Sequence, residues 1–351
     1  MEGSVRSKVS RNLSAAWSPS LARPWLAVDS WVRSHPFTMV LGAVGLGITV
    51  LHLHRLTSSP PGFYVDEASI GYNAYAISID GRDEHGESWP LFFKAFGEYK
   101  NPVLIYLIAG AMRLFGPSVG VVRMVPSLVS LLTAIVLGLL AYHIFRDRWL
   151  GLATFAAAGT LPWLFIIGRI GFEVSALPAA LSLFLLAWWK ADQESRPRRQ
   201  LLLAILAGLS LGVAIYTYTT ARLLVVILVA ALWAAYLSEW KRRWRPLAAT
   251  SLTALASYLP MASWSLQHPG QLTARFNSIS ILCRPVSSCN ANPEIVGNTD
   301  DGRFFPLVVA ERLLRVYLSG WRPSFLFYTG ESWGRHVTGH GGMLYVTLAP
   351  F

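Results

Sequence analysis

Long apolar runs separated by short basic turns constrain this chain most strongly. Residues 36–53 form the first run, which is long enough to cross a bilayer as a helix. Six further runs follow at 119–145, 149–167, 172–189, 200–217, 221–238 and 246–265. The composition agrees, because 53% of the 351 residues are hydrophobic and only 14% are charged, against about 25% in a soluble domain. The sequence therefore predicts an all-α integral membrane protein with about seven transmembrane helices.

The charges of the connecting turns predict the orientation of these helices. Three turns, at 146–148, 190–199 and 241–245, hold ten basic residues, whereas the alternate turns at 168–171 and 216–222 hold one each. By the positive-inside rule, the basic turns and the basic N-terminal arm (1–35) are cytoplasmic. The net charge of +11 is spread over these turns. No soluble segment carries a basic face with interleaved aromatics, which argues against nucleic acid as a partner.

The first outer loop, 54–118, is large, and two of its segments predict helices. Residues 102–115 are apolar but too short to cross a bilayer, so we expect a helix at the outer surface. Residues 66–79 predict a second, weakly amphipathic surface helix, and a polar connector from Asp80 to Asn101 joins the two. A membrane module at 36–265 precedes an outer C-terminal segment, 266–351, with an amphipathic helix at 305–319. Its apolar end predicts further spans beyond Phe351.

Two acidic pairs in the first outer loop are the leading candidates for chemistry. Carboxylates near a membrane face are costly unless they are solvated, paired or functional. Asp66 can act as a general base in a partly desolvated pocket, or it can cap a helix N-terminus. Its neighbour Glu67 either orients Asp66 or points to solvent. Asp83 and Glu84 fit turn chemistry, with an acceptor contact or a metal site as the alternative.

Several cations near the outer face can bind an anionic group. Lys100 precedes the second surface helix, where an ammonium and a helix N-terminus together favour a phosphate; snorkelling to the headgroups is the alternative. Arg123 can bind the same phosphate or anchor its helix at the interface. Arg169 and Glu173 can form an i, i+4 pair or contact the phosphate or sugar of a donor. Arg222 is a weaker candidate on the next outer turn.

The last outer segment adds histidines and cysteines. His336 can contact the donor, but His336 and His340 alone do not make a zinc site, which needs more ligands. No metal site is therefore predicted, although a divalent metal stays an open alternative. Cys283 and Cys289 either form a disulfide, which an oxidising compartment permits, or remain two thiols, because spacing alone does not establish the geometry.

Several outer segments carry a family resemblance: DEASIGYNAYA (66–76), RDEHG (82–86), YKNP (99–102), RIGFE (169–173) and YTYTTARL (216–223). Together they resemble the polyprenyl-phosphate-sugar-dependent transferases of glycosyltransferase family 39, bacterial members in particular. That family includes protein O-mannosyltransferases and the aminoarabinose transferases of lipid A. The resemblance covers residues 36–351 and implies a C-type glycosyltransferase fold in a plasma membrane. It places the catalytic Asp at Asp66 and the Lys-Pro element at Lys100, here with Asn101 before Pro102.

These observations predict a membrane glycosyltransferase. It would move a monosaccharide from a polyprenyl-phosphate donor to an outer hydroxyl of a lipid, protein or glycan by inverting displacement. The catalytic prediction is Asp66 with Glu67, and the phosphate prediction is Lys100 with Arg123 and Arg169. Residues predicted near the acceptor are Asp83, Glu84, Glu173, Arg222 and His336. The alternatives are a transporter or flippase of lipid-linked sugars, which would want charges deep within its spans, and a non-catalytic accessory subunit.

Overall fold

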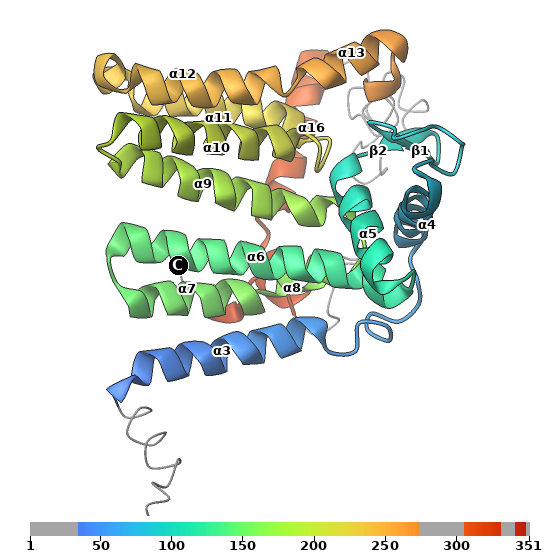
Figure 1. The fold of residues 1–351 in the computed structure, drawn as a ribbon, viewed down its shortest axis with the longest axis horizontal. Helices are drawn as coiled ribbons and strands as arrows, with labels where there is room; N and C mark the ends of the chain where they lie inside the picture. Colours follow the sequence, from blue (N-terminus) through green and yellow to red (C-terminus); the bar gives the residue numbers. More distant parts are fainter. Residues whose placement is uncertain (1–33, 274–304, 331–340, 349–351) are drawn as a thin grey trace, which may run out of the picture. The chain divides into compact units, whose positions relative to one another are not determined.

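The computed structural model describes residues 34–273, 305–330 and 341–348, and these are almost entirely helical (Figure 1). The chain divides into two compact units, Met1–Gly47 and Ile48–Phe351, and the contacts of the site all lie within the second. The α-helices are α3 (Pro36–Leu53), α4 (Val65–Asp80), α5 (Pro102–Phe115), α6 (Val119–Phe145), α7 (Arg148–Thr160), α8 (Pro162–Gly168), α9 (Leu177–Gln193), α10 (Pro197–Ile215), α11 (Ala221–Ala235), α12 (Trp240–Ala256), α13 (Leu259–Gln267) and α16 (Phe305–Ser319). The shorter elements are the strands β1 (Phe93–Ala95) and β2 (Glu98–Lys100) and the single turns η1 (Glu173–Ala176), η2 (Leu237–Glu239), η3 (Gln271–Thr273), η5 (Ser324–Tyr328) and η6 (Val346–Leu348).

Four described helices are long and apolar enough to cross a membrane, which indicates an integral membrane protein. They are α3, α6, η1 with α9, and α10. Two bent segments also qualify if each is counted as one span. The first consists of α7 and α8, and the second runs from α11 through η2 and α12 to α13. The described part of the chain then has up to six candidate spans. The predicted total of seven is therefore not confirmed, because the predicted spans at 221–238 and 246–265 count here as one bent pair.

The predicted span at 149–167 is broken rather than continuous. Helix α7 ends at Thr160, α8 begins at Pro162, and the two axes differ by 55°. Proline lacks a backbone N–H and its ring clashes with the preceding turn, so a helix bends or ends before it. The break matters for the site because it turns the chain toward the segment that carries Arg169 and Glu173.

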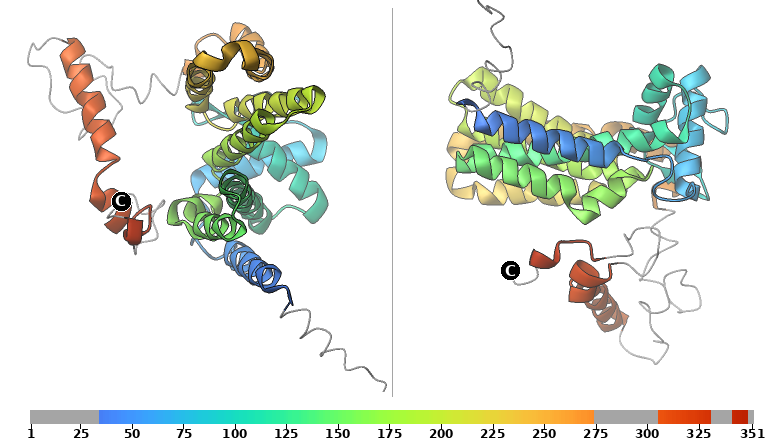
Figure 2. Two further views of the ribbon diagram at one scale, coloured as in Figure 1. Left: turned by 90° about the vertical axis from the view of Figure 1, so that its left-hand side faces the viewer. Right: turned by 90° about the horizontal axis from the view of Figure 1, so that it is seen from below.

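Glycines allow the long helices to approach each other closely. A Cβ atom at Gly138 of α6 would lie 2.8 Å from Cβ of Phe155 and 2.9 Å from the carbonyl oxygen of Gly151, both on α7. At Gly208 of α10 it would lie 2.6 Å from the carbonyl oxygen of Thr250 on α12. Small residues at helix contacts are typical of membrane bundles, where packing rather than hydrophobic burial holds helices together. Several of these helices are seen nearly end-on in the left panel of Figure 2.

Residues 54–118, the predicted first outer loop, fold over one end of this helix bundle (Figure 1, right side). Helices α4 and α5 confirm the two helices predicted for this loop within one residue at each end, and their place at a membrane surface stays a prediction. They pack on each other and on the start of α6 through a buried apolar cluster that includes Ile70, Ile77, Leu104, Ile108 and Val122. The connector between them contains a two-stranded antiparallel hairpin, β1–β2, in which Phe93 lies opposite Lys100. This small layer holds the residues of the candidate site.

Candidate active site

The hairpin brings Lys100 to Asp66. Phe96 and Gly97 make its two-residue turn at φ values of 53° and 78°, a conformation that glycine adopts without strain. The ammonium nitrogen of Lys100 donates to Oδ1 of Asp66 at 2.8 Å and to Oε1 of Glu98 at 3.0 Å. Glu98 and Lys100 lie two apart on β2, so their side chains point to the same side of the hairpin.

The side chain of Lys100 is only 7% exposed, and that of Asp66 is 17% exposed. Burial alone would lower the pKa of Lys100, but the hydrogen bonds that it donates to Asp66 and Glu98, together with the negative charges of Asp66 and Glu173, outweigh burial and raise it. Lys100 is thus a buried cation held by carboxylates. Asp66 lies in the first turn of α4 rather than at its N-cap, which is Tyr64, so the capping alternative for Asp66 is wrong.

Glu67 does not point to solvent, and whether it orients the adjacent Asp66 stays a prediction. It is 1% exposed and forms a two-pronged ion pair with Arg123, from Nε to Oε1 and from Nη2 to Oε2, both at 2.9 Å. The backbone N–H groups of Tyr64 and Gly171 also donate to its carboxylate, each at 3.0 Å. Glu67 therefore ties together the start of α4, helix α6 and the turn after α8, and the predicted solvent-facing role is wrong.

Arg123 is fully buried. Its remaining donors contact three backbone carbonyls of the segment after α3, those of Leu56, Pro60 and Gly62, at 2.5 to 3.0 Å. A guanidinium has five N–H donors, and together with Glu67 these contacts use all five. This geometry argues against the predicted phosphate role of Arg123, because no donor remains for an anion.

Arg169 makes a similar set of backbone contacts. Its two Nη atoms donate to the carbonyls of Leu51, His52, His54 and Ser59 at 2.7 to 3.1 Å. The first three lie at the C-terminal end of α3, where a cation satisfies orphan carbonyls and favours the helix dipole. The predicted i, i+4 pair with Glu173 is absent from the described contacts, and the phosphate role of Arg169 stays a prediction that this geometry does not favour.

Glu173 instead binds Asn101, the residue that follows Lys100. Its Oε2 accepts from the backbone N–H of Asn101 at 2.7 Å and from Nδ2 at 3.0 Å. Nη2 of Arg222 donates to Oδ1 of Asn101 at 3.1 Å. An arginine only donates and an ionised carboxylate only accepts, so these partners fix which way the amide points. Asn101, which is completely buried, thus bridges the carboxylate of Glu173 and the guanidinium of Arg222, which come from two turns remote in sequence.

The second acidic pair, Asp83 and Glu84, makes contacts that hold the connector in place. Oδ1 of Asp83 accepts from the backbone N–H groups of His85 and Glu87 at 2.9 and 2.8 Å, which confirms the turn alternative. Oε1 of Glu84 accepts from Nδ2 of Asn73 on α4 at 2.9 Å, and its backbone N–H donates to Oδ1 of Asn73 at 3.2 Å. The two residues therefore hold the connector on α4.

Some predicted residues fall outside the described part of the chain, namely His336, His340, Cys283 and Cys289. Among the described residues no group of three or more His, Cys, Asp or Glu side chains could hold a metal ion. The role of a divalent metal, and the state of the two cysteines, stay predictions.

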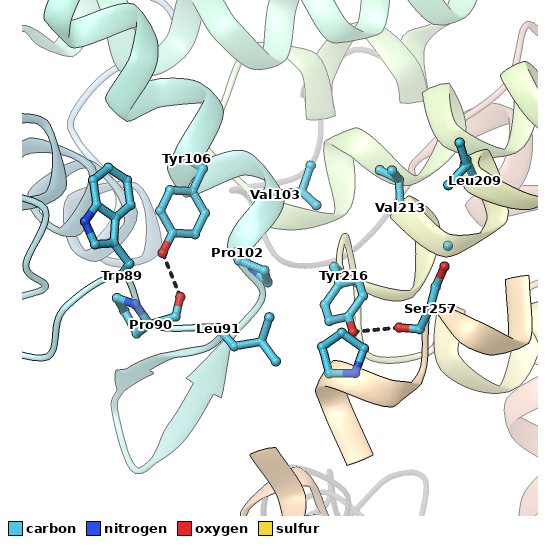
Figure 3. Close-up of a pocket in the computed structure, with 12 residues that line it drawn as sticks. Trp89, Pro90, Leu91, Pro102, Val103, Tyr106, Leu209, Val213, Tyr216 and Ser257 are labelled. Carbon is cyan, nitrogen blue, oxygen red and sulfur yellow. Dashed lines mark hydrogen bonds between the residues drawn. The ribbon is translucent and has the colours of Figure 1, made fainter. Parts of the chain in front are cut away.

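A pocket of about 600 Å³ lies beside the start of α5 (Figure 3). Apolar side chains and two tyrosines form most of its wall. These residues are Trp89, Pro90, Leu91, Pro102, Val103, Tyr106, Leu209, Val213, Tyr216 and Pro260. The hydroxyl of Tyr106 donates to the carbonyl of Pro90 at 2.8 Å, and that of Tyr216 donates to the carbonyl of Ser257 at 2.7 Å. Because both phenols are already bonded, the pocket offers mainly apolar surface, and Pro102 places it next to Asn101.

Sequence reasoning missed the hairpin and Asn101 as parts of the site. The segment AFGE at 95–98 carried a signal for the hairpin, because Gly97 stands at the second position of a possible two-residue turn. The role of Asn101 had no comparable signal, since its partners Glu173 and Arg222 are remote in sequence. The structure makes Arg222 a stronger candidate for anion binding than the sequence did, because its Nε is buried and bonds to no described atom.

Comparisons with known proteins agree with this layout. Residues 99–264 match the family described as dolichyl-phosphate-mannose-protein mannosyltransferase, whereas no curated protein sequence matches the chain. Among solved structures, the chain is similar to ArnT from Cupriavidus metallidurans bound to undecaprenyl phosphate. The identity is 15%, the TM-score is 0.51, and the match covers 82% of this chain and 51% of ArnT.

The apo oligosaccharyltransferase of Archaeoglobus fulgidus is a second structural relative. The identity is 18% and the TM-score is 0.51, over 84% of this chain and 38% of that enzyme. The chain thus spans about half of ArnT and less of the oligosaccharyltransferase, and at these identities the likeness concerns the fold. The expected helical fold of C-type glycosyltransferases is confirmed at that level. Over residues 99–264, slightly less than half of its length, the chain is similar to the family of dolichyl-phosphate-mannose-protein mannosyltransferases.

Proposed function

We propose that the chain is a membrane glycosyltransferase that takes a sugar from a polyprenyl-phosphate donor and transfers it to a hydroxyl group. The Asp66–Lys100 ion pair carries this proposal, because it places a partly exposed carboxylate beside a buried cation. The family description names a lipid-phosphate mannose donor, and the ArnT relative was crystallised with undecaprenyl phosphate. Both ligands combine a phosphate with a long apolar chain.

The reaction needs one base and one anion site. The acceptor oxygen attacks the anomeric carbon, its proton passes to Asp66, and the bond from that carbon to the phosphate oxygen breaks. Polyprenyl phosphate then leaves with the electron pair, and the configuration at the carbon inverts. Phosphate is already a good leaving group, so the chemistry depends mostly on the base and on binding the phosphate.

Lys100 is the leading phosphate ligand in this proposal. Its ammonium has three N–H donors, and Asp66 and Glu98 accept two of them, which leaves the third for the donor. Arg222 is the second cation that we assign to this role, in place of Arg123 and Arg169. Its Nε has no hydrogen bond to any described residue, and its Nη2 reaches Asn101, next to Lys100. The apolar pocket beside Pro102 suits the lipid chain.

The distribution of charge supports an outer location for this site. The candidate span from Glu173 to Gln193 begins at the site and ends at the basic turn that contains Arg196, Arg198 and Arg199. A helix of that length crosses the hydrocarbon core, so the site and the basic turn lie at opposite faces. Positive turns stay cytoplasmic, and the site is therefore extracytoplasmic in this proposal.

Transfer is tested with the protein in nanodiscs and a panel of radiolabelled polyprenyl-phosphate sugars, mannose first, with candidate lipid, peptide and glycan acceptors. Binding is tested separately with radiolabelled undecaprenyl phosphate. We expect Lys100→Gln to weaken that binding about 10- to 100-fold, the usual worth of a hydrogen bond to a charged group. Lys94→Gln, on the exposed face of the paired strand β1, is the matched control. Equal binding by the Lys100 variant and wild type would contradict the phosphate role.

Substitution of Glu98 is expected to strengthen the binding of undecaprenyl phosphate, whereas substitution of Lys100 weakens it. Its carboxylate occupies one donor of Lys100 at 3.0 Å and repels an incoming phosphate. We expect Glu98→Gln to bind undecaprenyl phosphate about two- to fivefold more tightly, the scale of a partly solvated ion pair. Glu87→Gln, an acidic residue in the same connector, should leave the affinity unchanged. Weaker binding by the Glu98 variant would mean that Glu98 supports the site instead of competing for it.

A further inference from the structure

Helix α9 ends, and helices α10 and α12 begin, at the end of the bundle opposite to α4, the helix that contains Asp66 (Figure 1, left side). Seven cations there have exposed side chains. They are Lys190, Arg196, Arg198, Arg199, Lys241, Arg242 and Arg245, and together they form the basic patch. With Arg243, eight basic residues face the three acidic residues Asp192, Glu194 and Glu239, which leaves an excess of five positive charges.

Specific contacts hold these three helix ends together. Arg243, at the start of α12, donates to the backbone carbonyl of Asp192 at 2.7 Å and lies 3.1 Å from its carboxylate. Gln200, in the first turn of α10, donates to the carbonyl of Ala191 at 3.1 Å. Glu239 also pairs with Arg242 and Arg243. The nearby acidic residues are thereby used in fixing the helix ends, and most of the patch keeps no carboxylate partner among the described residues.

Two exposed tryptophans stand beside the basic patch. Trp240 and Trp244 are 50% and 48% exposed, and their spacing of four places them on one side of α12. The guanidinium of Arg245 lies 5.6 Å from the ring centroid of Trp244. Exposed tryptophan is favoured at the level of lipid headgroups, where one edge of the ring meets hydrocarbon and the other meets water. The candidate span of α9 ends here and that of α10 begins here, so the tryptophans and the cations are expected at the level of the lipid headgroups.

We propose that the basic patch is a binding site for the headgroups of anionic phospholipids in the adjacent leaflet. Basic residues that only set the membrane topology need to lie near the membrane, and they need no particular arrangement relative to one another. Here cations from three helix ends are fixed in one surface, an arrangement that suits a lipid phosphate between helices. The two tryptophans favour a lipid over a soluble polyanion. This site is separate from the proposed transfer reaction.

The test is native mass spectrometry of the delipidated full chain, titrated in detergent with phosphatidylglycerol or with zwitterionic phosphatidylcholine. We expect the wild type to prefer phosphatidylglycerol. The double variant Arg198→Gln/Lys241→Gln should bind phosphatidylglycerol about 25-fold more weakly, roughly fivefold for each cation, with phosphatidylcholine unchanged. The matched control is Arg82→Gln/Lys94→Gln, which removes two exposed cations from the first outer loop and should stay within about twofold of wild type.

Two results would overturn the proposal. The first is equal binding of the two lipids by the wild-type chain, and the second is unchanged phosphatidylglycerol binding by the patch variant. All four substituted side chains are exposed, so we expect every variant to fold, and the midpoint of thermal unfolding verifies this. Binding to the patch variant should also lose part of its dependence on salt, because fewer ion pairs are screened.

Discussion

Replacement of Asp66 by Asn is expected to lower the rate of sugar transfer by about 10²- to 10⁴-fold, the usual contribution of a general base. The amide keeps the shape of the carboxylate and can still accept the hydrogen bond that Lys100 makes at 2.8 Å. It cannot take the proton of the acceptor hydroxyl. Oδ2 of Asp66 has no hydrogen bond in the described part of the chain, so it is the oxygen that we assign to the acceptor. The measurement is initial rates of sugar transfer in nanodiscs at saturating donor.

The same variant should still bind undecaprenyl phosphate within a fewfold of wild type, which separates a lost base from a lost donor site. Asp80→Asn is the matched control, because Asp80 is an exposed carboxylate at the other end of α4. Transfer by Asp66→Asn at the wild-type rate would contradict the base assignment. Movement of a lipid-linked sugar across the bilayer without any transfer would favour the flippase alternative. Absence of both activities in a well-folded wild type would favour the accessory subunit.

The sequence predicted the helices well because their signals are local. Long apolar runs gave α3, α6 and α10 within three residues of their observed bounds, and a short apolar run after Asn101 gave α5. Asp66 and Lys100 were also selected, and the structure places them in contact although 34 residues separate them. These successes rest on patterns that a membrane imposes on any chain, namely long apolar runs and charges confined to the turns.

The partners of the other charged residues could not be predicted in this way. Glu67, Arg123, Arg169 and Glu173 are all predicted to lie near the outer face, and sequence alone allows each to meet a donor. Which carboxylate meets which cation depends on how α4, α6 and the turn after α8 are placed in three dimensions. A buried charge must satisfy all its hydrogen bonds within the protein, and that demand removes Glu67 and Arg123 from the solvent-facing site. The hairpin that positions Lys100 was missed because each of its strands has only three residues.

The buried Glu67–Arg123 pair carries the largest expected effect on stability. Both side chains are 1% exposed, and between them they contact Tyr64, Gly171 and three carbonyls after α3. Glu67→Ala would leave a buried guanidinium without its counter-ion, and Arg123→Ala would leave a buried carboxylate. Removal of one partner of such a pair costs about 3–5 kcal/mol of unfolding free energy. The measurement is unfolding of the purified chain in mixed micelles by titration with SDS.

A double-mutant cycle tests whether the two residues act as one unit. The double alanine variant should lose much less than the sum of the two single losses, because neither charge is then left alone. The exposed pair Glu311–Arg315, four residues apart on α16, is the control, and its disruption should cost below about 0.5 kcal/mol. Additive losses would show that Glu67 and Arg123 support the fold independently. A stable Glu67→Ala chain that lost only sugar transfer would instead restore Glu67 to the catalytic role that the sequence predicts.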